Sequence, residues 1–153
     1  MLEIKNLKKT FDSGTEALNG VNLKVKKGEF LSILGPSGSG KTTLLRSING
    51  LETIDSGKIF FDSEKINKDN LFEVQKKTGM IFQEFNLVNN LSAINNVLTG
   101  LLNSSSKFFS MFYLFTKEQK LEALKSLETV GLLEKAYSRV DELSGGQRQR
   151  VGI

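Results

Sequence analysis

The chain has 153 residues, a formal net charge of +4, and 39% hydrophobic and 25% charged residues, a composition typical of one globular domain rather than of a disordered or fibrous chain. It contains neither Cys nor His, which excludes disulfides, thiolate metal sites and the side chain that most often serves as a general base. Its Lys and Arg residues are scattered, which favours a solvated basic surface and predicts no nucleic-acid partner.

The N-terminal stretch MLEIKNLKKTF mixes charged and apolar residues from position 3 onward, so we expect no signal peptide. No apolar run approaches the about 20 residues needed to span a bilayer. We therefore expect the protein in the cytosol or on the cytosolic face of a membrane.

The first half of the chain predicts strands around a glycine-rich turn. Alternating apolar residues and flanking turns predict strands at 2–7, 21–26, 57–62 and 80–83. The run EFLSILG at 29–35 is almost continuously apolar, which is typical of a central parallel strand buried on both faces. It leads through a glycine-rich turn into a helical pattern with Leu44, Leu45 and Ile48 on one side.

The second half predicts helices. From Ser92 onward, apolar residues recur three or four positions apart. Thr116 and Gln119 fit a capping box that opens a helix ending at Gly131. Between these helices, FFSMFYLF at 108–115 holds aromatic residues in a run too short to cross a membrane. It is either buried within the helical part or an exposed dock for a membrane partner.

The segment GPSGSGKT, Gly35 to Thr42, matches the pattern G-x-x-x-x-G-K-[ST]. Glycines allow backbone N–H groups to converge on phosphate oxygens, and a helix N-terminus adds a positive dipole end. Lys41 is suited to the β- and γ-phosphates and the Thr42 hydroxyl to Mg²⁺, while Thr43 can reach the α-phosphate. The alternative is a plain strand-to-helix turn, but such a turn needs no Lys and Thr at these offsets. The motif predicts binding of a nucleoside triphosphate.

A second anion-binding pattern lies in LSGGQ at 143–147. Ser144 is a good helix N-cap, and Gly145 and Gly146 leave the first-turn N–H groups sterically open. Two such helix starts could serve two ligands, or one ligand shared between two copies of the chain.

The phosphate loop, FQ at 82–83, and LSGGQ followed by RQRV together resemble the ATP-binding subunit of ABC transporters, over essentially the whole chain. The resemblance implies an α/β fold of the P-loop NTPase (RecA-like) class, with an N-terminal antiparallel β subdomain, an α-helical signature subdomain and an incomplete sheet. It implies a single ABC ATPase domain, with a β and phosphate-loop core at 1–91 and a helical subdomain at 92–153.

The resemblance also implies roles for individual residues. ATP and Mg²⁺ are the expected ligands, with Lys41 and Gln83 as catalytic residues and Thr42 and Gln83 at the metal. Gln83 would be the Q-loop glutamine, and Phe11 would stack on adenine. The residues expected to bind ATP in the same chain are Phe11, Gly35, Pro36, Ser37, Gly38, Ser39, Gly40, Lys41, Thr42 and Thr43. In the family two subunits face each other head to tail, so that the ATP of the partner would be contacted in trans by Ser144, Gly145, Gly146 and Gln147. Without the resemblance, Phe11 is also compatible with a core or loop aromatic, and Gln83 with an ordinary polar loop residue.

Within the family, the segments 79–102 and 107–132 look most similar to the ATPase of phosphonate importers, with polar amino-acid importers next. The expected partners are a second ATPase subunit, transmembrane permease subunits and, indirectly, a solute-binding protein, at the cytoplasmic face of the membrane. Family members continue beyond the signature helix to an Asp, a general-base Glu and a switch His, none of which lies in 1–153. One alternative is therefore a nucleotide-binding fragment without hydrolysis. A separate alternative, less in keeping with the scattered charge, is a non-transport ABC ATPase acting on nucleic acid or ribosomes.

Overall fold

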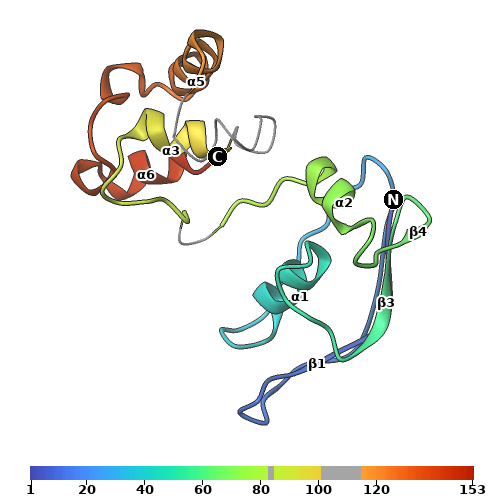
Figure 1. Ribbon diagram of the computed structural model, residues 1–153. Coiled ribbons are helices and arrows are strands. Elements are labelled where there is room, and N and C mark those ends of the chain that lie inside the picture. Colours follow the sequence, from blue (N-terminus) through green and yellow to red (C-terminus); the bar gives the residue numbers. More distant parts are fainter. Residues whose placement is uncertain (83–84, 101–114) are drawn as a thin grey trace. The chain divides into compact units, whose positions relative to one another are not determined.

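The computed structural model describes residues 1–82, 85–100 and 115–153. The chain divides into two compact units, Met1–Met80 and Ile81–Ile153. The first unit contains the strands β1 (Leu2–Thr10), β2 (Glu16–Val25), β3 (Ser56–Phe61) and β4 (Glu64–Lys65) and the helices α1 (Lys41–Ile48) and α2 (Leu71–Lys77). The second contains α3 (Ala93–Gly100), α5 (Lys117–Thr129) and α6 (Gly145–Val151), with short 3-10 turns η2 (Leu133–Lys135) and η3 (Val140–Glu142) (Figure 1).

The strands of the first unit form one antiparallel sheet in the order β2-β1-β3-β4. This confirms the predicted antiparallel β subdomain and the strands expected at 2–7, 21–26 and 57–62. The pairing of β1 with β3 is interrupted by an irregularity opposite Gly57, which has φ +100°. A Cβ at Gly57 would lie 2.5 Å from the carbonyl oxygen of Asn6, so only glycine allows the two strands to approach there.

The core of the first unit is formed by buried side chains of the sheet and of α1, which are Ile4, Leu7, Leu18, Leu44 and Ile59. Helix α2 is attached to the end of α1 through Asn49. The Gln75 side-chain amide donates to the Asn49 carbonyl at 2.9 Å, and the Thr78 hydroxyl donates to Asn49 Oδ1 at 2.6 Å. The helix that begins at the phosphate loop is therefore fixed at its other end.

The prediction of a buried parallel strand at 29–35 is wrong. This segment is not a strand, and Phe30 and Leu34 are 93% and 88% exposed. A parallel strand forms only against neighbouring strands that supply hydrogen bonds on its edges, and every strand pair among the described residues is antiparallel and excludes this segment. The strand expected at 80–83 is also absent over 80–82, for the same reason; residue 83 lies outside the described residues.

The second unit confirms the helical second half of the chain. Helix α5 opens with the predicted capping box, in which the Gln119 N–H donates to the Thr116 hydroxyl and the Thr116 N–H donates to the Gln119 side chain. Gly131, with φ +68°, follows its last turn. The buried core of this unit is Ala93, Ile94, Leu98, Ala123, Leu127, Leu132, Ala136, Val140, Leu143 and Val151. Of the aromatic segment 108–115, only Phe115 lies within the described residues, and it packs against this core.

The start of α3 is held by the segment that precedes the signature. The N–H groups of Ala93 and Ile94 donate to the carbonyls of Ser138 and Ala136 at 3.0 and 2.8 Å. Within the described ranges of the chain, no helix is both long and apolar enough to span a bilayer.

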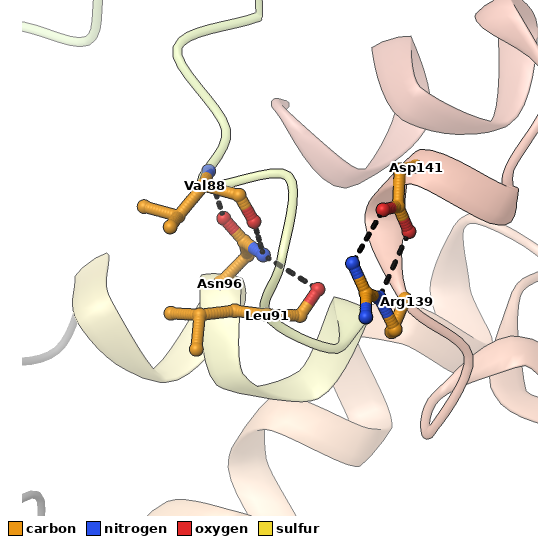
Figure 2. A network of polar contacts seen from close by, with 5 residues as sticks. All are labelled: Val88, Leu91, Asn96, Arg139 and Asp141. Atoms are coloured by element: carbon orange, nitrogen blue, oxygen red, sulfur yellow. Dashed lines mark hydrogen bonds and ion pairs between the residues drawn. The ribbon is translucent and has the colours of Figure 1, made fainter.

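The loop before α3 is organised by a buried amide. Asn96 is 7% exposed, and its side chain accepts from the Val88 N–H at 2.7 Å and donates to the carbonyls of Val88 and Ser92 at 3.1 and 3.0 Å. Figure 2 shows the two bonds to Val88, together with the Arg139–Asp141 ion pair. The Asn96 side chain is the acceptor of the Val88 N–H and adds a second bond to the carbonyls of Val88 and Ser92, so it ties residues 88–92 to α3.

Candidate functional site

The phosphate loop curls around the ammonium group of Lys41. Lys41 Nζ donates to the carbonyl oxygens of Gly35 and Pro36 at 2.8 and 2.7 Å, and lies 3.1 Å from the Ser39 hydroxyl. The loop residues 35–39 are exposed. The cation of the motif therefore sits at the centre of an accessible loop, held by groups of the loop itself.

Two glycines give the loop its path. Gly38 and Gly40 have φ +80° and +84°, in the left-handed region that side chains disfavour. A Cβ at Gly40 would also lie 2.2 Å from the carbonyl oxygen of Ala17, whereas one at Gly38 would have no atom within 4 Å. Gly40 thus lets the loop lie directly against β2, while Gly38 leaves open space above the loop.

The first turn of α1 is free to receive an anion. Gly40 is its N-cap, with no side chain bonded to the first-turn N–H groups and no acidic residue in that turn. Thr42 is exposed and Thr43 is half-buried. N–H groups without a side-chain cap, the positive end of the helix dipole and Lys41 together form a site that attracts phosphate oxygens.

Phe11 lies near this loop, through β2. It directly follows β1, and its N–H donates to the carbonyl of Thr15 at 2.9 Å across the turn that leads into β2. Ala17, which contacts Gly40, is the second residue of β2. Phe11 is 37% exposed, so part of its ring is accessible, and the strand that follows its turn contacts the phosphate loop at Gly40.

Lys9 is a residue that the sequence reasoning missed. The expectation of a solvated basic surface is wrong for this residue, because it is only 8% exposed and pairs with Glu52 at 3.0 Å. Its ammonium group also lies 5.3 Å from the centroid of the Phe11 ring. The one signal in the sequence was its position two residues before Phe11, in phase with the buried Leu7 along β1.

The signature segment forms the expected capped helix. The Gln147 N–H donates to the Ser144 hydroxyl at 3.3 Å, and the Ser144 N–H donates to the Gln147 side chain at 2.8 Å. Gly145 and Gly146 are exposed, and a Cβ at either would meet no atom within 4 Å. The helix is anchored by the buried side chains of Leu143 and Val151. The first turn of α6 is therefore rigidly held and presents an uncovered glycine surface.

Just before this segment, Arg139 and Asp141 form a two-pronged ion pair at 3.1 and 2.6 Å. The hydrogen bonds from the Arg139 guanidinium lower the pKa of Asp141 below its usual value. The pair is exposed, so we assign it a local role in shaping the turn before the signature.

The structure groups the predicted site residues by unit. Phe11 and the phosphate loop belong to Met1–Met80, and Ser144 to Gln147 belong to Ile81–Ile153. Gln83 lies outside the described residues, so its predicted role stays a prediction. Among the described residues there is no cluster of three or more carboxylates that could hold a metal by itself. Thr42 offers a hard, exposed hydroxyl oxygen beside the phosphate site, which suits Mg²⁺, an ion that usually keeps several waters and takes few protein ligands.

Comparison with solved structures finds the same fold in ABC cassettes. The chain resembles the dimeric structure of the bacterial ABC transporter cassette MJ0796 with a TM-score of 0.84 and 37% identity, covering 100% of this chain and 67% of that one. It resembles the dimeric post-hydrolysis state of the same cassette, bound to ADP and Pi, with a TM-score of 0.83 and 36% identity, covering 99% and 67%. These likenesses confirm the α/β, P-loop NTPase fold class.

Two relatives carry the same name. The chain is 50% identical over 156 residues to the phosphonates import ATP-binding protein PhnC of Lactobacillus delbrueckii subsp. bulgaricus, covering 100% of this chain and 61% of that protein. It is 48% identical over 152 residues to the protein of that name from Thiobacillus denitrificans, covering 99% and 59%. The chain thus spans about 60% of the length of these relatives. A family model described as ABC transporter matches residues 18–153. The chain therefore belongs to the ABC transporter family of ATP-binding proteins.

Proposed function

We propose that this chain is the nucleotide-binding part of the ATPase subunit of an ABC importer of the phosphonate type. The observation that carries the proposal is the phosphate loop. In it, Lys41 is held at the centre of an accessible loop, at the start of a helix that has no side-chain cap. The names of the relatives from Lactobacillus and Thiobacillus support phosphonate as the transported class. The importer, its solute and its other subunits belong to this proposal.

In the proposed complex, ATP binds by exchange within the loop. The phosphate oxygens replace the carbonyls of Gly35 and Pro36 as the acceptors of Lys41, because an ammonium group forms stronger hydrogen bonds with an anion than with a neutral carbonyl. The first-turn N–H groups of α1 supply further donors. When bound, Mg²⁺ neutralises charge on the β- and γ-phosphates. Thr42 is the described residue that would hold it, and we propose Gln83 as its second contact.

Positioning of the phosphates and charge stabilisation carry most of the catalysis in phosphoryl transfer. We propose that Lys41 stabilises charge that develops on the transferred phosphoryl group, and that Gln83 positions the attacking water. We propose that Ser144 to Gln147 contact the ATP of a second copy, because Gly145 and Gly146 are exposed and open space lies where their side chains would be. The subunit pair would bind permease subunits, with a solute-binding protein beyond them, and lie peripherally on the cytoplasmic face of the membrane. The division into a core at 1–91 and a helical subdomain at 92–153 remains part of this proposal.

The test is nucleotide binding and turnover by the intact protein. Lys41→Ala should weaken binding of ATP with Mg²⁺ by at least about tenfold, as expected for loss of a charge-assisted contact, and should abolish hydrolysis. Lys76→Ala is the matched control, because Lys76 is an exposed lysine paired with Glu73 on α2. Binding that is equal in the two variants would refute the site. Binding without turnover in the intact wild type would identify a non-hydrolytic module instead.

The substrate class is tested in cells. Uptake of a labelled alkylphosphonate should require the gene and be lost with Lys41→Ala. Uptake of a polar amino acid that depends on the gene, with phosphonate uptake unchanged, would assign the subunit to the other importer class.

A further inference from the structure

We propose that Lys9 is a positioning residue for nucleotide binding, which holds the ring of Phe11 in the orientation that stacks on the nucleotide base. The inference rests on the proposed function and on the expected stacking of Phe11 on the base, since it concerns the same site. It adds a charged residue, Lys9, and its partner Glu52 to the residues that the motifs identify.

The side chain of Lys9 is held in one position. Its side chain is buried in the first unit, and its ammonium group contacts Glu52 Oε1 at 3.0 Å and Thr53 Oγ1 at 3.1 Å. A buried cation is stable only when paired and hydrogen-bonded, and both partners meet that need. Glu52 is itself held near α1, because its N–H donates to the carbonyl of Arg46 at 3.3 Å.

The ammonium group of Lys9 also contacts the aromatic ring of Phe11. Its Nζ lies 5.3 Å from the centroid of Phe11, within the about 6 Å over which a cation is attracted to an aromatic face. Phe11 keeps 37% of its surface exposed. Lys9 therefore restrains the ring while leaving part of it open for a base.

The surrounding backbone links Lys9 and Phe11 to the phosphate loop. On one side of Lys9 the Thr10 N–H donates to Asp55 Oδ2 at 2.6 Å, and on the other the Asp55 N–H donates to the Lys8 carbonyl at 3.0 Å. Lys9 pairs with Leu18 of β2, whose neighbour Ala17 contacts Gly40. The segment after α1 thus grips the end of β1, and Lys9 connects the ring to the helix that begins at the phosphates.

A double-mutant cycle with two ligands separates the positioning of Phe11 by Lys9 from a purely structural role of Lys9, because a structural role would weaken the binding of both ligands equally. The intact protein would be titrated with ATP and with inorganic tripolyphosphate, each with Mg²⁺, for the wild type, Lys9→Met, Phe11→Ala, the double variant and Lys9→Arg. Tripolyphosphate has no base and reports the phosphate loop alone.

We expect Lys9→Met to weaken ATP binding about two- to fivefold, the lower end of the range of cation–π contacts, because the Phe11 ring keeps 37% of its surface exposed, and to leave tripolyphosphate binding unchanged. It should cause no further loss when Phe11 is already Ala, and Lys9→Arg should keep wild-type affinity. Equal losses for both ligands, or additive losses in the double variant, would overturn the proposal.

Two further outcomes are distinguished. If the wild type binds neither ligand, the proposed function itself fails and the inference falls with it. If Lys9→Met unfolds the protein because Glu52 is left unpaired, the variant Lys9→Met with Glu52→Gln removes both charges. It must show the same selective loss of ATP affinity, and a wild-type ATP affinity in that folded variant refutes the role of Lys9.

Discussion

Replacing Gly40 by Ala should damage the phosphate loop more than any other glycine substitution with the same backbone angle. Gly28, Gly38 and Gly40 share φ values of +78°, +80° and +84°. Each Gly→Ala change therefore carries a similar cost for left-handed backbone, about 1–2 kcal/mol. At Gly40 alone the new Cβ would lie 2.2 Å from backbone, the Ala17 carbonyl oxygen. Backbone cannot rotate away as a side chain can, so relief requires the loop and β2 to separate.

Forcing a methyl group into a closed space adds about 1–3 kcal/mol, so Gly40→Ala should cost about 2–5 kcal/mol in total. In a protein of this size class, each additional kcal/mol of destabilisation lowers the thermal unfolding midpoint by roughly 2–4 °C. The steric cost should therefore place the midpoint of Gly40→Ala below that of Gly28→Ala. Gly28→Ala controls for the backbone angle outside the site, and Gly38→Ala controls for it inside the loop, where a Cβ meets nothing.

The assay is thermal unfolding of the intact protein, with and without ATP and Mg²⁺. We expect Gly28→Ala to keep the stabilisation by ATP, and Gly40→Ala to lose both stability and stabilisation by ATP. Equal midpoints for Gly28→Ala and Gly40→Ala would refute the steric reasoning, because the two changes share the backbone angle and the clash exists only at Gly40.

Other expectations follow from single residues. Asn96→Leu should cost about 1–3 kcal/mol in urea unfolding, since it leaves the Val88 N–H without its acceptor and removes the amide bonds to the Val88 and Ser92 carbonyls; a loss under about 0.5 kcal/mol would show that residues 88–92 do not depend on it. Ser144→Ala and Thr116→Ala should each cost about 0.5–2 kcal/mol as lost N-caps, but only Ser144→Ala should lower ATP turnover; equal turnover would argue against the signature role. The lowered pKa of Asp141 means that its ion pair with Arg139 stabilises the folded state above the unfolded pKa of about 3.9 and that this stabilisation fades as the pH falls through the lower folded value. Asp141→Asn should remove that part of the pH dependence, and unfolding curves between pH 2 and about pH 5 would check it.

The motifs that depend on local backbone chemistry were predictable from the sequence. Both capped helices, at Thr116 and Ser144, begin where the serine or threonine was expected, because a capping box is complete within four residues. The pairing of β1 with β2 also follows from alternation, since these two strands are consecutive along the chain.

Features that depend on distant partners were not predictable. The run at 29–35 has the composition of a buried strand, yet strand formation requires neighbours that no local pattern supplies. The burial of Lys9 depends on Glu52, more than forty residues away along the chain. The pattern of charges along the sequence predicts that such a lysine is solvated. In both cases the side chain is ordinary and its surroundings decide the outcome.

The attachment of Asn49 to α2 has a consequence for binding thermodynamics. Helix α1 starts at the phosphate loop and is followed by its C-cap, Asn49, whose carbonyl and side chain are held by Gln75 and Thr78. The donors of the first turn are thus already aligned before any ligand arrives. The conformational entropy of these donors is lost when the protein folds, so their ordering does not weaken nucleotide binding. Loosening this distant anchor, by Thr78→Val for example, should weaken nucleotide binding through a less favourable binding entropy, although no atom of Thr78 reaches the loop.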